Sequence, residues 1–326
     1  MNYALCFPGQ GSQEIGMGLE LYNTFHSAKD VFDEADDALS FKITGIIFDG
    51  QDEELKRTAV TQPALLTMGV AAVTVLEKEM GVTLSPTCGA GHSLGEYTAL
   101  VSSKVLSFRD AVELVHKRGE WMQDAAPEGV GSMAAILGLG VSEIIKICES
   151  VAPNMECQAA NFNSPGQTVI SGVREFVEKA MAEALASGAK KAIPLNVSAP
   201  FHSRLMMPAA LRLRKQFENY RWSDAAWPIV SNVSSAPVSL AQDIRKALFE
   251  QTYSPVFWAD SVIRMAKDGV DAFLEFGPGG VLTGLNKRCL KGLTPKDGAA
   301  KFVTMFASTP KELEAMAEYI TGNKNE

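Results

Sequence analysis

Short apolar runs alternate along the chain with longer segments in which apolar residues recur at helical spacing. This alternation is typical of an α/β fold with a largely parallel sheet, because parallel strands are joined by helical crossovers. The runs predict strands at 3–7, 87–91, 229–231, 272–276 and 302–305. The helical pattern covers 17–40, 62–79, 95–103, 107–124, 204–219, 257–267, 280–290 and 309–320.

One segment has a different order. Residues 131–197 predict strand, helix, two strands, helix and strand, at 133–137, 141–150, 156–161, 167–171, 175–187 and 191–195. The β-α-β-β-α-β order is that of a ferredoxin-like unit. We therefore predict a large α/β domain over 1–126 and 199–320, interrupted by a small ferredoxin-like α+β subdomain over 127–198. A cleft between the two is the expected substrate site.

Composition excludes several classes of protein. The 326 residues are 46% hydrophobic and 21% charged, which is enough for a globular core. A net charge of −8 argues against binding to nucleic acid or to an anionic membrane surface. No apolar run reaches the roughly 18 residues that span a bilayer, and the first residues resemble a buried strand more than a signal peptide. The five cysteines form no CxxC pair and indicate a reducing, cytoplasmic setting.

The candidate chemistry begins at Ser93. The segment 91–95 matches GxSxG at the change from a predicted strand to a predicted helix. Glycines allow the sharp turn that lifts a serine hydroxyl above a helix N-terminus, as in α/β-hydrolase-like domains, and we expect the large domain to be of this kind. The N–H of Leu94 would then face a developing oxyanion. The alternative is an ordinary glycine-rich turn, which the pattern alone does not exclude.

A nucleophilic serine needs a base, and the chain has four histidines. His26 lies on a polar helix end, His116 sits within a helix, and strand alternation turns His92 away from its neighbour Ser93. His202 remains as the candidate, placed after Pro200 and before a helix. For each histidine taken alone, a structural role is the simpler interpretation.

Arg118 lies on the apolar face of the helix predicted at 107–124, four residues after Leu114 and four before Met122. A guanidinium turned inward is costly unless it meets a carboxylate or phosphate. An internal salt bridge, or a side chain that reaches solvent, is the alternative.

The glycine-rich segment 7–13 follows the first predicted strand but does not fit a dinucleotide loop, because Glu14 stands where the third glycine of GxGxxG belongs. Such a loop can instead bring the backbone of Gln10 beside Ser93 as a second oxyanion donor. We expect no cofactor and no metal ion. The stretch 277–280 predicts a strand-to-helix turn.

Seven motifs together resemble the malonyl-CoA:acyl-carrier-protein transacylases of bacterial fatty-acid synthesis, and they cover nearly the whole chain in the expected order. They are FPGQGSQ at 7–13, TQPAL at 61–65, GHSLGEYTAL at 91–100, RGEWMQ at 118–123, NSPGQTVISG at 163–172, APFHS at 199–203 and EFGPGGVL at 275–282.

The resemblance implies a role for each candidate. Ser93 would carry the acyl group, His202 would be the base, and the main-chain carbonyl of Gln251 would orient it, so that no acidic third member is needed. The amides of Gln10 and Leu94 would form the oxyanion hole.

The resemblance also implies how the acyl group is chosen. Arg118 would hold the free malonyl carboxylate, with Met122 and Phe201 as further substrate-binding residues. Related enzymes for branched acyl groups tend to carry serine where this chain has Phe201, so the chain resembles the malonyl-selective form.

Malonyl-CoA and acyl carrier protein would then be the partners in a ping-pong transfer. A trans-acting acyltransferase of polyketide synthesis, a serine thioesterase or esterase and a dinucleotide-binding protein are the alternatives. A carrier protein that is itself acidic would need a basic docking patch on this acidic chain. The candidates are Lys287, Arg288 and Lys291, or Arg204, Arg212 and Lys215. Solvated helix faces are the simpler interpretation for any one of these residues.

Overall fold

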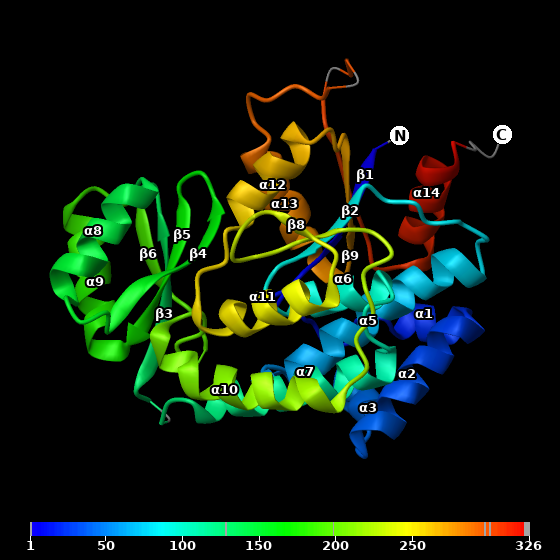
Figure 1. Ribbon diagram of the computed structural model, residues 1–326, viewed down its shortest axis with the longest axis horizontal. Coiled ribbons are helices and arrows are strands. Elements are labelled where there is room, and N and C mark those ends of the chain that lie inside the picture. Colours follow the sequence, from blue (N-terminus) through cyan, green and yellow to red (C-terminus); the bar gives the residue numbers. More distant parts are fainter. Residues whose placement is uncertain (1, 128, 198, 297, 300, 323–326) are drawn as a thin grey trace.

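The computed structural model describes residues 2–322 except 128, 198, 297 and 300, and it contains two sheets (Figure 1). The larger sheet has the order β10-β9-β1-β2-β7-β8, and its neighbouring strands are parallel except β7 and β8. Its strands are β1 Tyr3–Phe7, β2 Cys88–Gly91, β7 Ile229–Val230, β8 Pro237–Val238, β9 Ala272–Phe276 and β10 Val303–Ala307.

Helices cover both faces of this sheet, as a parallel sheet requires. Alternate residues of β1 enter two different cores: Leu5 packs in the core that contains α2, α5 and α6, whereas Cys6 packs against α12 and α13. The α-helices of this part are α1 Leu19–Thr24, α2 His26–Leu39, α3 Ile43–Asp49, α4 Asp52–Leu55, α5 Thr58–Lys78, α6 Leu94–Ser102, α7 Phe108–Asp124, α10 Met207–Gln216, α11 Ala241–Tyr253, α12 Trp258–Lys267, α13 Val281–Cys289 and α14 Pro310–Thr321. Short 3-10 turns are η1 Arg204–Met206, η2 Phe217–Asn219 and η3 Pro278–Gly280.

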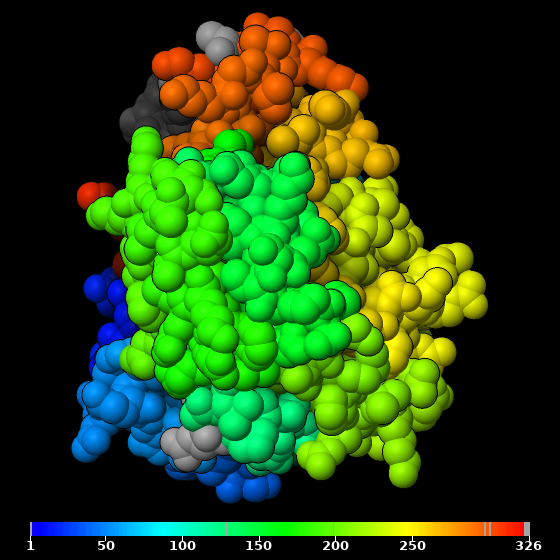
Figure 2. All heavy atoms as spheres, turned by 90° about the vertical axis from the view of Figure 1, so that its left-hand side faces the viewer, coloured from blue at the N-terminus to red at the C-terminus, as the bar shows by residue number. Residues whose placement is uncertain are grey.

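The smaller sheet is antiparallel, with the order β4-β5-β3-β6. Its elements follow one another as β3 Gly131–Leu137, α8 Val141–Val151, β4 Cys157–Ser164, β5 Gln167–Val173, α9 Arg174–Ala186 and β6 Lys191–Pro194. This is the ferredoxin-like order and pairing. Figure 2 shows this unit as one continuous green surface on its side of the molecule.

The predicted fold class is confirmed, and the five strands predicted for the large sheet are all present. The predicted helix 17–40 was wrong as a single element, because the chain is extended at Phe25 and divides it into α1 and α2. The pattern missed β8, α3, α4 and α11. The domain boundaries at 127 and 198 stay a prediction, with the antiparallel strands lying between residues 131 and 194.

Helix α5 is long and apolar enough to cross a membrane by length and composition alone. In the fold, however, 89% of its most apolar window is buried. It packs against α2, α6 and α7, so its apolar surface belongs to the protein core.

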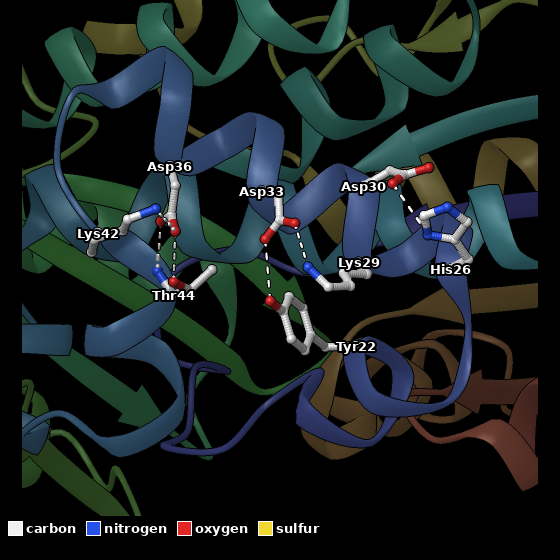
Figure 3. Close-up of polar contacts among 8 residues, drawn as sticks. All are labelled: Tyr22, His26, Lys29, Asp30, Asp33, Asp36, Lys42 and Thr44. Carbon is white, nitrogen blue, oxygen red and sulfur yellow. Dashed lines mark hydrogen bonds and ion pairs between the residues drawn. The ribbon is translucent and has the colours of Figure 1, made fainter.

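Asp36 near the end of α2 joins that helix to α3 (Figure 3). The carboxylate is buried and accepts hydrogen bonds from the backbone N–H of Thr44 at 3.0 Å and from its hydroxyl at 2.7 Å. Lys42 lies 3.3 Å away but is largely exposed. Asp36 therefore satisfies an N–H in the first turn of α3, where helices have no internal acceptor.

We predict that Asp36→Ala lowers the free energy of unfolding by about 1–3 kcal/mol, because it leaves the amide of Thr44 without its partner. Urea denaturation measures the change. Asp33→Ala on the same helix is the matched control: Asp33 bonds exposed Lys29 at 2.6 Å and Tyr22 at 3.2 Å, and its loss should cost less than about 1 kcal/mol. Equal losses in the two variants would contradict the prediction.

Candidate active site

Ser93 lies in the sharp turn between β2 and α6, with φ 52° and ψ −103°. Side chains on the flanking glycines have no room: a Cβ at Gly91 would lie 1.9 Å from the backbone of Gly95, and one at Gly95 would lie 2.0 Å from the carbonyl oxygen of Phe7. The end of β1 therefore packs directly under the turn. This packing holds Ser93 in a backbone conformation that is strained for a residue with a side chain.

His202 lies beside Ser93, with 2.7 Å between its Nε2 and the serine Oγ. Its other ring nitrogen, Nδ1, lies 2.8 Å from the main-chain oxygen of Gln251. A carbonyl oxygen can only accept, so Nδ1 carries the proton, and Nε2 of the neutral ring is left as an acceptor toward the serine hydroxyl.

The imidazole of His202 is held in its neutral form. Burial and the positive charge of Arg118 lower its pKa to about 3, although the bond to Gln251 acts in the opposite direction. A neutral imidazole is the form that accepts a proton from a serine.

Arg118 on α7 is only 1% exposed, and its guanidinium points at the serine. It donates to the side-chain oxygens of Gln62 at 2.7 Å and Gln251 at 2.9 Å, and to Ser93 Oγ at 3.3 Å. The centroid of the Tyr97 ring lies 5.3 Å from the Cζ atom of Arg118. Within the described chain no carboxylate comes within ion-pair distance, and its Nε has no hydrogen-bond partner. A buried cation that meets only neutral groups can bind an anion strongly.

Gln251 on α11 connects the base and the cation. Its main-chain oxygen accepts from His202 and its side-chain oxygen accepts from Arg118. Its Nε2 donates to the main-chain oxygen of Ser93 at 2.8 Å and to Glu96 at 3.0 Å. One residue thus fixes the positions of three groups around the serine.

Sequence reasoning missed three polar residues of this network: Gln62, Glu96 and Asn232. The side chain of Asn232 accepts from the N–H of Ser93 and donates to the carbonyl of Gly91, both at 2.7 Å. A signal for Asn232 was present, since it follows a predicted strand whose carboxyl end lies at the same sheet edge as the serine turn. Gln62 lies in the TQPAL motif and Glu96 in the GHSLGEYTAL motif. Their hydrogen-bond partners, Arg118 and Gln251, come from segments far away in the sequence, so the motifs alone do not reveal the contacts.

The loop that contains Gln10 lies against the serine turn. Strand β1 pairs with β2 up to Phe7 and Gly91, and a Cβ at Gly9 would lie 2.3 Å from the carbonyl oxygen of His92. Leu94 is the first residue of α6, where backbone N–H groups have no partner within the helix. The oxyanion role of the Gln10 and Leu94 amides stays a prediction.

The other three histidines make bonds away from the serine. His92 Nε2 lies 2.8 Å from Asn163 Oδ1, and His116 Nδ1 lies 2.7 Å from the main-chain oxygen of Ala59. His26 is exposed and pairs with Asp30 on α2 (Figure 3). The elimination that led to His202 therefore agrees with where the four rings lie.

A cavity lies between the two units, but Ser93, His202 and Arg118 are not among its lining residues, so the expected substrate cleft stays a prediction. This cavity of about 1190 Å³ is lined by Gln10 and Trp121 from the large unit and by Gly129, Arg174 and Asn196 from the connecting and small-unit segments. Met122 and Phe201 are buried nearby in one apolar cluster, which also contains residues of β3, β4 and β5. Of the residues described, no group of three His, Cys, Asp or Glu side chains could hold a metal ion.

Comparison with known proteins agrees with this arrangement. Residues 5–317 match the family described as the acyl transferase domain. The chain is 49% identical over 312 residues to the malonyl CoA-acyl carrier protein transacylase of Bacillus subtilis strain 168, covering 95% of each chain. It is 46% identical over 292 residues to the enzyme of the same name from Escherichia coli K12, covering 90% of this chain and 94% of the other.

Solved structures agree over the whole fold. An acyl-carrier-protein S-malonyltransferase from Bartonella henselae matches with a TM-score of 0.93 at 40% identity, covering 98% of this chain and all (100%) of the other. A malonyl transacylase solved with the acyl carrier protein of a type II polyketide synthase matches with a TM-score of 0.91 at 40% identity, covering 99% of this chain and 100% of that one. The chain therefore belongs to the malonyl CoA-acyl carrier protein transacylase family.

Proposed function

We propose that this protein transfers the malonyl group of malonyl-CoA to the phosphopantetheine thiol of acyl carrier protein, and that Ser93 carries the group between them. The observation that supports this most is the buried guanidinium of Arg118, 3.3 Å from a serine that is itself 2.7 Å from an imidazole. The transfer supplies fatty-acid elongation. The reducing setting indicated by the cysteines supports a cytoplasmic location for this reaction.

In the first half-reaction, His202 Nε2 takes the hydroxyl proton of Ser93 as Oγ attacks the thioester carbonyl. The amides of Leu94 and Gln10 receive the oxyanion of the tetrahedral intermediate. The carbon–sulfur bond then breaks, and His202 returns the proton to the leaving thiolate of CoA. The carrier-protein thiol reverses these steps in the second half, giving up its proton to His202 while the Ser93 ester is cleaved.

The acyl group is chosen by Arg118. Its Nε has no hydrogen-bond partner, and its two Nη atoms are held by the side-chain oxygens of Gln62 and Gln251. The guanidinium can therefore donate hydrogen bonds to the malonyl carboxylate, a group that acetyl does not have. The bulk of buried Phe201 favours an unbranched acyl chain, and Met122 in the same cluster forms part of the apolar wall.

Two alternatives use the same serine. A thioesterase is expected to have an acidic residue that accepts a hydrogen bond from His202 Nδ1 and orients the ring. Here the acceptor is the main-chain oxygen of Gln251. A polyketide-pathway acyltransferase would share the whole site and differ in its carrier protein.

The residues proposed to dock the carrier protein are all exposed: Lys287, Arg288, Lys291, Arg204, Arg212 and Lys215. Arg288 bonds Gln167 at 2.6 Å, and Arg212 lies 3.7 Å from Asp124.

Incubation with excess malonyl-CoA alone is expected to leave a malonyl group on Ser93, because no carrier-protein thiol is present to complete the transfer. Intact-mass and peptide mass spectrometry detect the adduct. Ser93→Ala should carry none, and His202→Ala should form it far more slowly, by roughly 100-fold or more, without its base. A wild-type protein that stays unmodified would rule out the proposed function.

Arg118→Ala should lower kcat/KM for malonyl-CoA by roughly 10- to 100-fold, because charge-assisted hydrogen bonds contribute about 1.5–3 kcal/mol. Acylation by acetyl-CoA has no carboxylate to lose and should fall much less. Single-turnover rates with both thioesters in both proteins give the comparison. A parallel loss for the two substrates would show that Arg118 only maintains the fold of the site.

The pH dependence of acylation should reflect the lowered pKa of His202, which burial and Arg118 bring to about 3. Because the base of the free enzyme stays neutral far below the usual histidine range, kcat/KM for acetyl-CoA should change little between about pH 8 and about pH 5.5. In Arg118→Ala, assayed with acetyl-CoA, the acid limb should move to higher pH since the repelling charge is gone. A wild-type midpoint near the ordinary value of about 6.5 would contradict this.

A further inference from the structure

Glu96 on α6 is a buried carboxylate that the transfer mechanism leaves unused. It is 2% exposed, and its Oε2 accepts from Gln251 Nε2 at 3.0 Å and from the N–H of Asn232 at 3.2 Å. Helix α6 also packs against α5, α7, β1, β2 and β7, and within the described chain no charged side chain from these elements bonds to Glu96. Its hydrogen bonds are thus made to neutral donors.

Glu96 and Arg118 are two opposite buried charges joined by a single amide. The side chain of Gln251 accepts from Arg118 at its oxygen and donates to Glu96 at its nitrogen, at 2.9 and 3.0 Å. A buried ion needs a compensating charge nearby, because the cost of removing it from water is several kcal/mol. The carboxylate and the guanidinium supply that compensation to each other through the amide.

The malonyl carboxylate adds a second negative charge to this pair. In a dry site one guanidinium cannot balance two carboxylates, so one of them takes up a proton. The substrate carboxylate can touch the guanidinium directly, whereas Glu96 is separated from it by Gln251. Glu96 is therefore the group that gives up its charge.

We propose that Glu96 is the counter-charge of Arg118 in the free enzyme and becomes protonated when a malonyl group occupies Ser93, so that loading malonyl, but not acetyl, takes up a proton. This inference rests on the proposed function, since it requires that Arg118 receives the malonyl carboxylate. Its consequence is that the preference for malonyl over acetyl falls as the pH rises.

The environment of Glu96 supports this. Burial raises its pKa to about 7 in spite of the lowering contributions of Gln251, Asn232 and the charge of Arg118. When the malonyl carboxylate neutralises Arg118, the charge that lowers the pKa of Glu96 is lost, and the pKa of Glu96 rises further.

The other titratable groups around the pair do not replace Glu96 as the proton acceptor. Tyr97 from the same helix has its pKa raised to about 12 by burial, so it stays protonated. His202 and His92 have lowered pKa values, chiefly because they are buried. A proton released or taken up near neutral pH is thus assigned to Glu96.

The bond changes of acylation transfer one proton within the site. The hydroxyl proton of Ser93 passes through His202 to the sulfur of CoA as the carbon–sulfur bond breaks and the ester bond forms. Partial ionisation of the released CoA thiol near pH 8 is the same for both thioesters, so a difference in net uptake between malonylation and acetylation reports a group of the enzyme.

The test measures proton uptake with a pH indicator in weak buffer while intact-mass spectrometry counts acylated serines. At about pH 8, where Glu96 of the free enzyme is mostly ionised, we expect malonylation to take up about one proton more per acylated Ser93 than acetylation does. Glu96→Gln should abolish this difference. Glu275→Gln is the matched control, because Glu275 is equally buried but bonds the amides of Leu282 and Thr283. It should leave the uptake at the wild-type level.

Infrared difference spectra supply a second readout that needs no variant. Malonylation should produce the carbonyl band of a protonated carboxylic acid that shifts in deuterium oxide, and acetylation should not. Malonylated protein without uptake or without this band, or uptake that persists in Glu96→Gln, would overturn the inference while leaving the proposed function intact. Failure of malonylation itself would instead reject the proposed function, and the inference with it.

Discussion

The site depends on the hydrogen bonds of Gln251. Its main-chain oxygen orients the imidazole of His202, and its side-chain amide holds Arg118 on one side and the backbone of Ser93 on the other. Helix α11 is therefore the element that sets the base, the cation and the nucleophile in one geometry. Because the acceptor on His202 Nδ1 is a main-chain oxygen, no ionisable side chain orients the ring directly.

The serine turn is the second constraint, and it is built by close packing. Strand β1 ends beneath the turn, and the backbones approach so closely that glycine is required at 91 and 95. Asn232 then bonds both the N–H of Ser93 and the carbonyl of Gly91. Rigid packing and a two-ended hydrogen bond together maintain a strained conformation, which places the hydroxyl before the reaction begins.

Burial of Arg118 links substrate choice to the strength of the base. Its charge helps to keep His202 neutral in the free enzyme, and that same charge opposes an imidazolium ion during the reaction. Under the proposed function, a malonyl carboxylate in contact with Arg118 would offset its charge more directly than Glu96 does and would make the imidazolium less costly. Acyl groups without a carboxylate would not do this, so selection would act on the reaction as well as on binding.

The sequence by itself determined the fold class, the strand-turn-helix around Ser93, the inward face that carries Arg118 and, by elimination, the candidate base His202. These follow from local periodicity and turn chemistry, which act over a few residues. Gln251 was reached only through family resemblance, since the pattern missed α11, and Glu96 and Asn232 were not identified at all. Their roles arise from hydrogen bonds between segments up to 158 residues apart. Only tertiary packing, which also buries the charges and shifts their pKa values, decides which of these distant polar groups meet.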